Sequence, residues 1–67
     1  MTLTIRNDQG LEFLFECKEF IGYDVFCAVR DQWDYDWHTY QVIDQDQVLE
    51  NVINPNDLDP STAESIH

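Results

Sequence analysis

Apolar and polar residues alternate through the first 18 positions, which predicts two half-buried strands, over residues 2–6 and 11–18. Between them, Asn7 and Gly10 are typical of a type I turn that ends in a left-handed glycine. One register brings the apolar side chains of both strands onto a single face. It pairs Asn7 with Leu11, Ile5 with Phe13 and Leu3 with Phe15. The pattern therefore predicts a β-hairpin.

Two further strands are predicted in the middle of the chain. Residues 23–30 follow Gly22 and include apolar residues at both odd- and even-numbered positions, which favours a central strand that is covered on both faces. Residues 37–43 are rich in residues that favour extended structure. Cys17 and Cys27 lie symmetrically about Gly22, so a disulfide across this hairpin is geometrically feasible. Two cysteines in a cytosolic setting favour reduced thiols instead.

The spacing of the apolar residues changes after Ile43. Four apolar residues then follow the i, i+1, i+4, i+5 spacing of one helical stripe: Val48, Leu49, Val52 and Ile53. Asp44 suits the N-cap position, and Pro55 ends the segment because the residue before proline avoids helical angles. We therefore predict a helix near residues 45–53.

These elements predict an α+β fold: a small antiparallel β-meander of about four strands with one helix packed on the sheet. Residues 1–54 would form a single β-rich domain, and residues 55–67 a polar C-terminal tail with one short helical turn. The predicted helix covers only part of the sheet. The surplus apolar surface favours a homodimer or a protein partner.

Charge narrows the functional classes. The 67 residues hold 14 acids and 3 bases, for a net charge of −11, yet 43% of residues are hydrophobic and 13% aromatic, which indicates a folded chain. This charge repels nucleic acid and acidic membranes. No apolar run approaches the roughly 20 residues of a membrane span, and the first residues do not resemble a signal peptide. We therefore expect a cytoplasmic protein with neither nucleic acid nor membrane as a direct partner.

Catalytic and metal-binding patterns are weak. Asp34, Asp36 and His38 alternate along the chain, but strand neighbours on one face stand about 6.8 Å apart, too far to share an ion without a bend. The aspartates that begin at Asp44 and Asp57 lack the glycine that a calcium loop needs at its sixth position. The cysteines lie among acids, whereas a reactive thiolate needs a basic neighbourhood. The sequence predicts a non-enzymatic protein without a cofactor or a metal.

Aromatic and acidic residues alternate strictly from Trp33 to Trp37. One interpretation is an edge segment that buries its rings in the core. The other is an aromatic anchor within an acidic rim, because Trp and Tyr dominate interface energies. The two interpretations are compatible if one tryptophan is buried and the other is presented.

Acids occur in every segment, without the alternating sign of a salt-bridged surface. Carboxylates spaced about 7 Å apart along a strand can take the place of backbone phosphates in a basic groove, because such a groove responds mainly to the spacing of negative charges. In charge and size the chain is similar to phage-encoded counter-defence proteins, such as anti-CRISPR and anti-restriction proteins and uracil-glycosylase inhibitors, although it carries no motif of theirs. This similarity implies an inhibitor that mimics nucleic acid and acts in the host cytoplasm.

The expected partner is the basic surface of a nucleic-acid-binding protein. The candidate partner-binding residues come from the second strand and from the aromatic run: Glu12, Glu16, Asp31, Trp33, Asp34, Tyr35, Asp36 and Trp37. The alternative function is an immunity or adaptor module that anchors on the aromatic run. Solubility remains a rival explanation for the charge.

Overall fold

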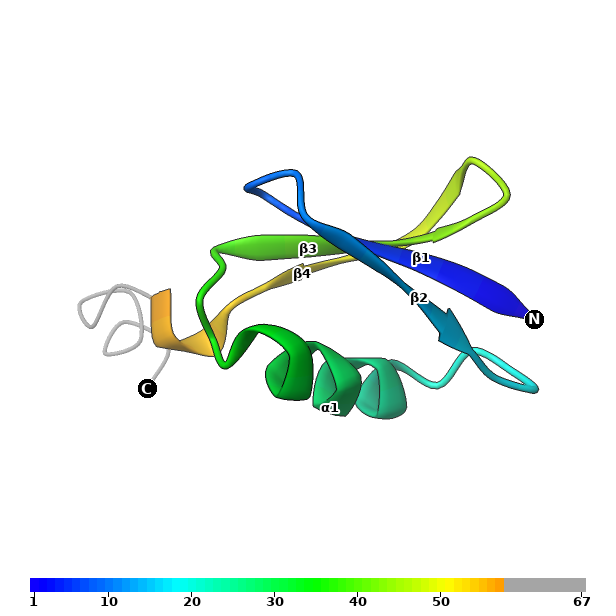
Figure 1. Cartoon of the computed structure of the whole chain (residues 1–67), viewed down its shortest axis with the longest axis horizontal. Coiled ribbons are helices and arrows are strands. Elements are labelled where there is room, and N and C mark those ends of the chain that lie inside the picture. The colour runs from blue at the N-terminus through cyan, green and yellow to red at the C-terminus, as the bar shows by residue number, and fades with distance from the viewer. Residues whose placement is uncertain (58–67) are drawn as a thin grey trace, which may run out of the picture.

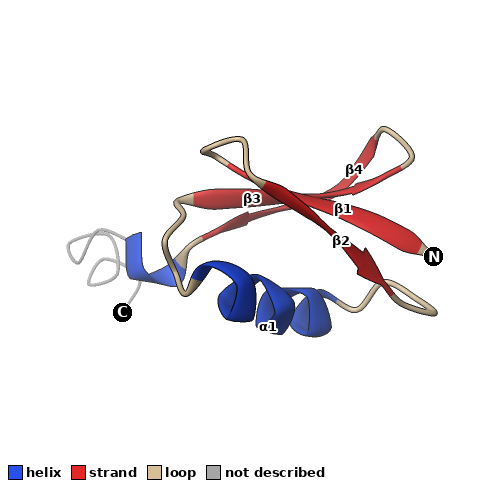
Figure 2. Cartoon of the chain, viewed as in Figure 1, coloured by secondary structure: helices blue, strands red, loops and turns tan. Residues whose placement is uncertain are grey.

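The computed structural model describes residues 1–57, which form two β-hairpins joined through one helix (Figures 1 and 2). The elements are β1 (Thr2–Asn7), β2 (Glu12–Glu16), α1 (Gly22–Trp33), β3 (Thr39–Asp44), β4 (Gln47–Ile53) and the 3-10 turn η1 (Pro55–Asp57). The strands form one antiparallel sheet in the order β2-β1-β3-β4. The predicted α+β class, with one helix and a four-stranded antiparallel sheet, is confirmed.

The first hairpin has the predicted register. Ile5 pairs with Phe13 and Leu3 with Phe15. At the turn, the Asn7 side-chain oxygen accepts the backbone N–H groups of Gln9 and Leu11 at 2.9 and 3.0 Å, and Gly10 takes a φ of 84°. A glycine adopts this left-handed conformation without the steric cost that a side chain adds.

The strand predicted over residues 23–30 is wrong, because this segment is part of helix α1. Val25 and Val29 are fully buried, and together with Phe26 and Trp33 they make a stripe at helical spacing. Tyr23 made the segment look apolar on two faces, but it is 73% exposed on the outer side of the helix. Since Gly22 begins α1, no hairpin joins the two cysteines. Cys17 and Cys27 are both free.

The helix predicted near residues 45–53 is also wrong, because these residues turn and then form β4. Gln45 and Asp46 both have positive φ, 48° and 71°, as a two-residue type I′ turn requires. Ile43 pairs with Val48 but Val42 pairs with Glu50, so the register shifts by one residue on β4. This β-bulge spaces the apolar residues of β4 as a helix would.

The core lies between α1 and one face of the sheet, and α1 runs beneath that face in Figure 1. Seven hydrophobic side chains of residues 1–57 are buried: Leu3, Ile5, Val25, Val29, Trp37, Tyr40 and Val42. Of the predicted C-terminal tail, Pro55–Asp57 form η1, and residues 58–67 lie outside the described part of the chain.

Candidate interaction surface

The rings of the aromatic run turn toward the core. Trp33 ends α1 and packs edge-on against Phe13, with ring centroids 5.0 Å apart. Trp37 is only 3% exposed and meets Tyr40 edge-on at 4.9 Å. Tyr35, half-buried, stacks on Trp37 at 6.5 Å. Trp37 is therefore buried, as the core interpretation predicts, and Trp33 and Tyr35 are partly exposed at the rim.

The backbone after α1 turns the aspartates of this run outward. Asp34 caps the helix in the left-handed region, with φ 47°, and its N–H donates to the carbonyl of Arg30. Tyr35 follows with φ 65°. Two successive left-handed residues reverse the chain, so that alternate side chains point in and out. Asp34 and Asp36 are exposed, and so is Asp31 on the last turns of α1.

Asn54 holds this connection against the sheet. Its side-chain amide donates to the carbonyl of Tyr35 at 2.9 Å and to that of Trp37 at 2.6 Å. Its backbone N–H donates to the carbonyl of His38 at 2.8 Å. Asn54 is 1% exposed, so these bonds satisfy carbonyls that would otherwise lack a partner. The positions of Asp34 and Asp36 therefore depend on a residue nearly twenty positions away, which no local pattern indicates.

His38, at the same end of the molecule, forms hydrogen bonds with two aspartates. Asp8 accepts the backbone N–H of His38 at 2.8 Å, and this bond lowers the pKa of Asp8. The His38 Nδ1 lies 2.7 Å from a carboxylate oxygen of Asp57. That contact raises the pKa of His38, and the charges of Asp8 and Asp36 add to the effect. These contacts tie η1 and the first turn to the start of β3.

Four exposed carboxylates follow the outer side of α1 and the loop after it. We call them the acidic helix surface: Asp24, Asp31, Asp34 and Asp36. At about 100° per residue, the first three lie within about 80° of one another around the helix axis. The buried valines of α1 lie on the opposite side. The only base on α1 is Arg30, which lies beside Tyr35.

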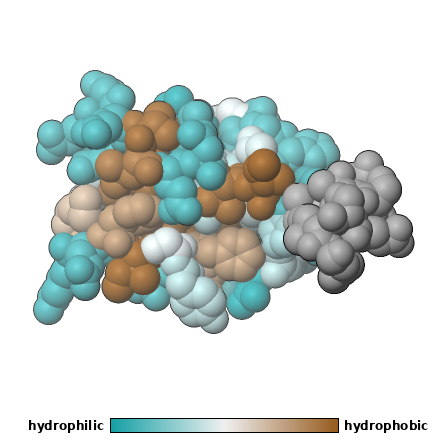
Figure 3. Space-filling view, turned by 180° about the vertical axis from the view of Figure 1, so that it is seen from behind, coloured by the Kyte–Doolittle hydropathy of each residue, from teal (hydrophilic) through white to brown (hydrophobic). Residues whose placement is uncertain are grey.

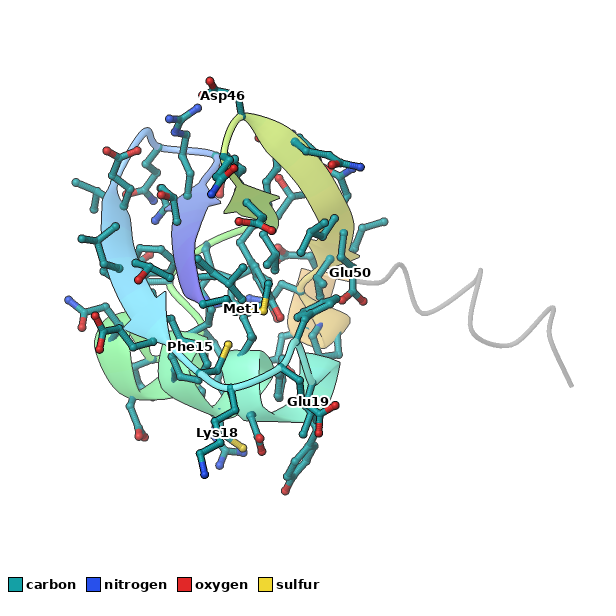
Figure 4. All side chains as sticks on the ribbon, turned by 90° about the vertical axis from the view of Figure 1, so that its right-hand side faces the viewer. Met1, Phe15, Lys18, Glu19, Asp46 and Glu50 are labelled. Atoms are coloured by element: carbon teal, nitrogen blue, oxygen red, sulfur yellow. The ribbon has the colours of Figure 1, made fainter. Side chains whose placement is uncertain are left out.

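Glu50 is an acid that faces α1 from the sheet. It pairs with Val42 on the inner face of β4, and its carboxylate lies 3.3 Å from where a side chain on Gly22 would begin. The absence of that side chain allows the carboxylate to approach the positive end of the helix. Figure 4 shows Glu50 on β4 and Glu19 in the loop before α1. Burial, with a contribution from Glu50, raises the pKa of Tyr40 to about 12.

Glu12 and Glu16 lie elsewhere. Both are exposed on β2, on the sheet face that points away from α1. Glu12 forms an ion pair with Arg6 at 3.0 Å. The structure therefore divides the eight candidate residues between two surfaces. Asp31 and the five residues of the aromatic run lie near the end of α1, whereas the two glutamates lie across the sheet. Asp24 is an acid of the helix surface that the candidate set missed, because its segment was interpreted as a strand.

Within residues 1–57 there is no group of three His, Cys, Asp or Glu side chains placed to hold a metal ion, and no pocket. The one described α-helix is too short and too polar to cross a bilayer. On residues 1–57, a partner would therefore contact exposed side chains on the surface and would be recognised by charge and shape.

Comparison with protein-family models, with curated proteins and with solved structures finds no match to this chain. The geometry and the charge of residues 1–57 therefore carry the functional proposal.

Proposed function

We propose that this protein is a small acidic inhibitor that presents carboxylates in place of phosphates and blocks the basic groove of a nucleic-acid-binding protein. The observation that carries the proposal is the acidic helix surface, where Asp24, Asp31, Asp34 and Asp36 are exposed together. Residues 1–57 contain two ion pairs, Arg6–Glu12 and His38–Asp57, and neither involves these four aspartates. Their charge is therefore free to act on a partner.

The spacing of the carboxylates supports this proposal. Asp24 and Asp31 are seven residues apart on the helix, or about 10.5 Å along its axis. Asp34 is the C-cap residue of α1 and follows Asp31 by three residues, so it extends the acidic row past the end of the helix. A row of fixed negative charges raises the association rate with a basic groove, and salt weakens this attraction.

Rigidity supports it as well. α1 is fixed by its buried valines, and the loop that follows is fixed by Trp37 and Asn54. A surface that is already ordered loses less conformational entropy on binding than a flexible acidic segment does. A rigid acidic row next to a dense core therefore suits an inhibitor that competes with nucleic acid.

The test is a capture experiment with the full chain immobilised, using a nuclease-treated bacterial lysate at about 50 and about 500 mM NaCl. We expect nucleic-acid-binding proteins to be retained at low salt and to be released both by high salt and by excess duplex DNA. Retention that survives high salt, or that DNA does not compete away, would overturn the proposal.

A matched pair of variants locates the surface. The first neutralises the helix surface with Asp24→Asn, Asp31→Asn and Asp34→Asn. The control removes the same charge elsewhere with Glu16→Gln, Asp44→Asn and Asp46→Asn. The first set should abolish capture of the DNA-competed proteins and the control should largely preserve it. Equal loss in both would indicate that net charge alone attracts the partners, and would overturn the assignment to this surface.

A further inference from the structure

The sheet face that points away from α1 is uncovered within residues 1–57. We call it the open face (Figure 1). A row of four cross-strand neighbours crosses it from one edge of the sheet to the other. Leu14 pairs with Thr4, Thr4 with Ile43, and Ile43 with Val48. The row is apolar except for the threonine hydroxyl, and it runs over all four strands.

The apolar side chains of this face are exposed to an unusual degree. Leu14 is 70% exposed, Val48 44% and Ile53, which pairs with Thr39 on the same face, 62%. Figure 3 shows the molecule from the side of β4, where the open face is seen edge-on, and hydrophobic side chains gather on this side among hydrophilic ones. Polar side chains such as Gln41 and Asn51 lie between them, but several large apolar side chains exposed on one face of a small protein commonly mark an interface.

The open face is nearly neutral, although the protein is strongly acidic. Of the described acids, it carries only Glu12 and Glu16, and Glu12 is paired with Arg6. The other described acids lie on α1, in the turns and loops, on η1 or on the side of the sheet that faces α1. Asp46, for example, lies at the tip of the β3–β4 turn (Figure 4). The fold therefore separates the apolar face from most of the charge.

We propose that the open face binds a second copy of this chain, sheet against sheet, about a two-fold axis. A cationic partner would be drawn to the acidic helix surface, not to a face with so little charge. A second copy brings an equally neutral, equally apolar face to a sheet separation of about 10 Å. In this arrangement both helices, with their aspartates, point away from the interface. The repelling charges are then far apart, and both acidic helix surfaces stay accessible.

The size of the face predicts a weak dimer. Four strands at about 4.8 Å spacing, each about six residues long at about 3.4 Å per residue, give a footprint of about 400 Å² on each copy, or about 800 Å² in total. Stable complexes bury about 1,200–2,000 Å², so this dimer should dissociate readily. Each copy carries a charge of −11, and salt screens the repulsion between them. The dimer should therefore strengthen with salt, whereas binding to a basic partner should weaken.

The test is sedimentation equilibrium of the full chain, from about 10 μM to about 1 mM protein, at about 50 and about 500 mM NaCl. We expect the dimer fraction to rise with concentration and with salt. The double variant Leu14→Gln, Val48→Gln should weaken association at least about tenfold. The control Tyr23→Gln, which removes a ring that is 73% exposed on α1, should not change it. Circular dichroism checks that each variant is folded.

Three results would overturn the proposal: a monomer at about 1 mM in both salts, a dimer that salt weakens, or equal association of the double variant and the wild type. NMR shifts provide a second measurement. The amides of Thr4 and Ile43 should move when the protein is concentrated. If they move instead only when a lysine-rich peptide is added, the open face belongs to a cationic partner. Either outcome is independent of capture through the acidic helix surface.

Discussion

Asn54→Ala should be among the most damaging substitutions in the molecule, although it removes only one small polar side chain. The Asn54 amide donates to the carbonyls of Tyr35 and Trp37, and its side-chain oxygen accepts the N–H of Asn56 at 2.9 Å. Alanine would leave all three groups without these partners. The loop that carries Trp37 would then lose the side-chain bonds that attach it to the segment after β4, while the backbone bond from residue 54 to the carbonyl of His38 would remain.

The expected loss follows from these three bonds. The bond to Trp37 is buried, and an unsatisfied buried group costs about 1–3 kcal/mol. The bonds to Tyr35 and Asn56 are partly buried, at roughly 1 kcal/mol each. The total is about 3–5 kcal/mol. A chain of 67 residues has a free energy of unfolding of about 3–10 kcal/mol. The variant should therefore lose about a third or more of its free energy of unfolding at 25 °C.

The assay is urea unfolding followed by tryptophan fluorescence, with Asn51→Ala as the control because Asn51 is exposed on β4, three residues before Asn54. Asn54→Asp is a second variant that keeps the shape of the side chain. Its carboxylate cannot donate to the two carbonyls, but its protonated form can donate to one. Relative to the wild type, this variant should therefore regain stability as the pH falls. If Asn54→Ala lies within about 1 kcal/mol of Asn51→Ala, the argument from buried carbonyls is refuted.

Three further predictions concern the histidine, the second turn and the aromatic run. The pKa of His38 is raised above 6.5 chiefly by its hydrogen bond with Asp57, so Asp57→Asn should lower it in an NMR titration; an unchanged value would contradict the pairing. Because the folded-state pKa is the raised one, the stabilisation is complete below about pH 6.5, the unfolded value, and is lost as the pH rises through the folded-state pKa. Asp46→Gly should increase the free energy of unfolding by about 0.5–1 kcal/mol, and so raise the melting temperature, because Asp46 has a φ of 71° and glycine adopts this conformation without steric cost. A lower melting temperature would show that the contacts of the Asp46 side chain contribute more stability than the relief of backbone strain. Trp37→Ala should cost about 3–5 kcal/mol in urea unfolding and Trp33→Ala less, because Trp33 is only half-buried; small, equal losses would contradict the core role of the run.

The first hairpin could be predicted in detail because its signals are local and agree. The turn needs Asn7 and Gly10, and the alternation of the two strands admits one register that puts Leu3, Ile5 and Phe13 on the same face. A one-residue slip would expose all of them. Pattern and turn chemistry therefore indicate the same pairing, and the structure has it.

The sequence prediction assigned α1 as a strand and β4 as a helix, because the apolar residues of each segment have the spacing that is typical of the other kind of element. In α1, the inward stripe of Val25 and Val29 is interrupted by Tyr23 and Cys27, which are apolar by type but lie outside the buried stripe. In β4, the bulge lets Leu49 and Val52 both pack against the core although they are three residues apart, which is a helical spacing. A bulge and an outward aromatic ring depend on tertiary packing, which hydrophobic spacing does not contain. The predicted fold class is nevertheless correct, because one segment predicted as a strand is the helix and the segment predicted as the helix is a strand.

This exchange changes what the acids can do. On a strand, Asp24 and Asp31 would have pointed to opposite faces, because they are an odd number of residues apart. On a helix, a separation of seven residues returns them to nearly the same side. Asp34 joins them because the chain ends α1 with a left-handed residue there. Acids that looked scattered along the sequence thus become a row on one side of the molecule, while the open face keeps almost none of them. A preference of partners for that row over any other acids, at equal net charge, would be a property of the fold rather than of composition.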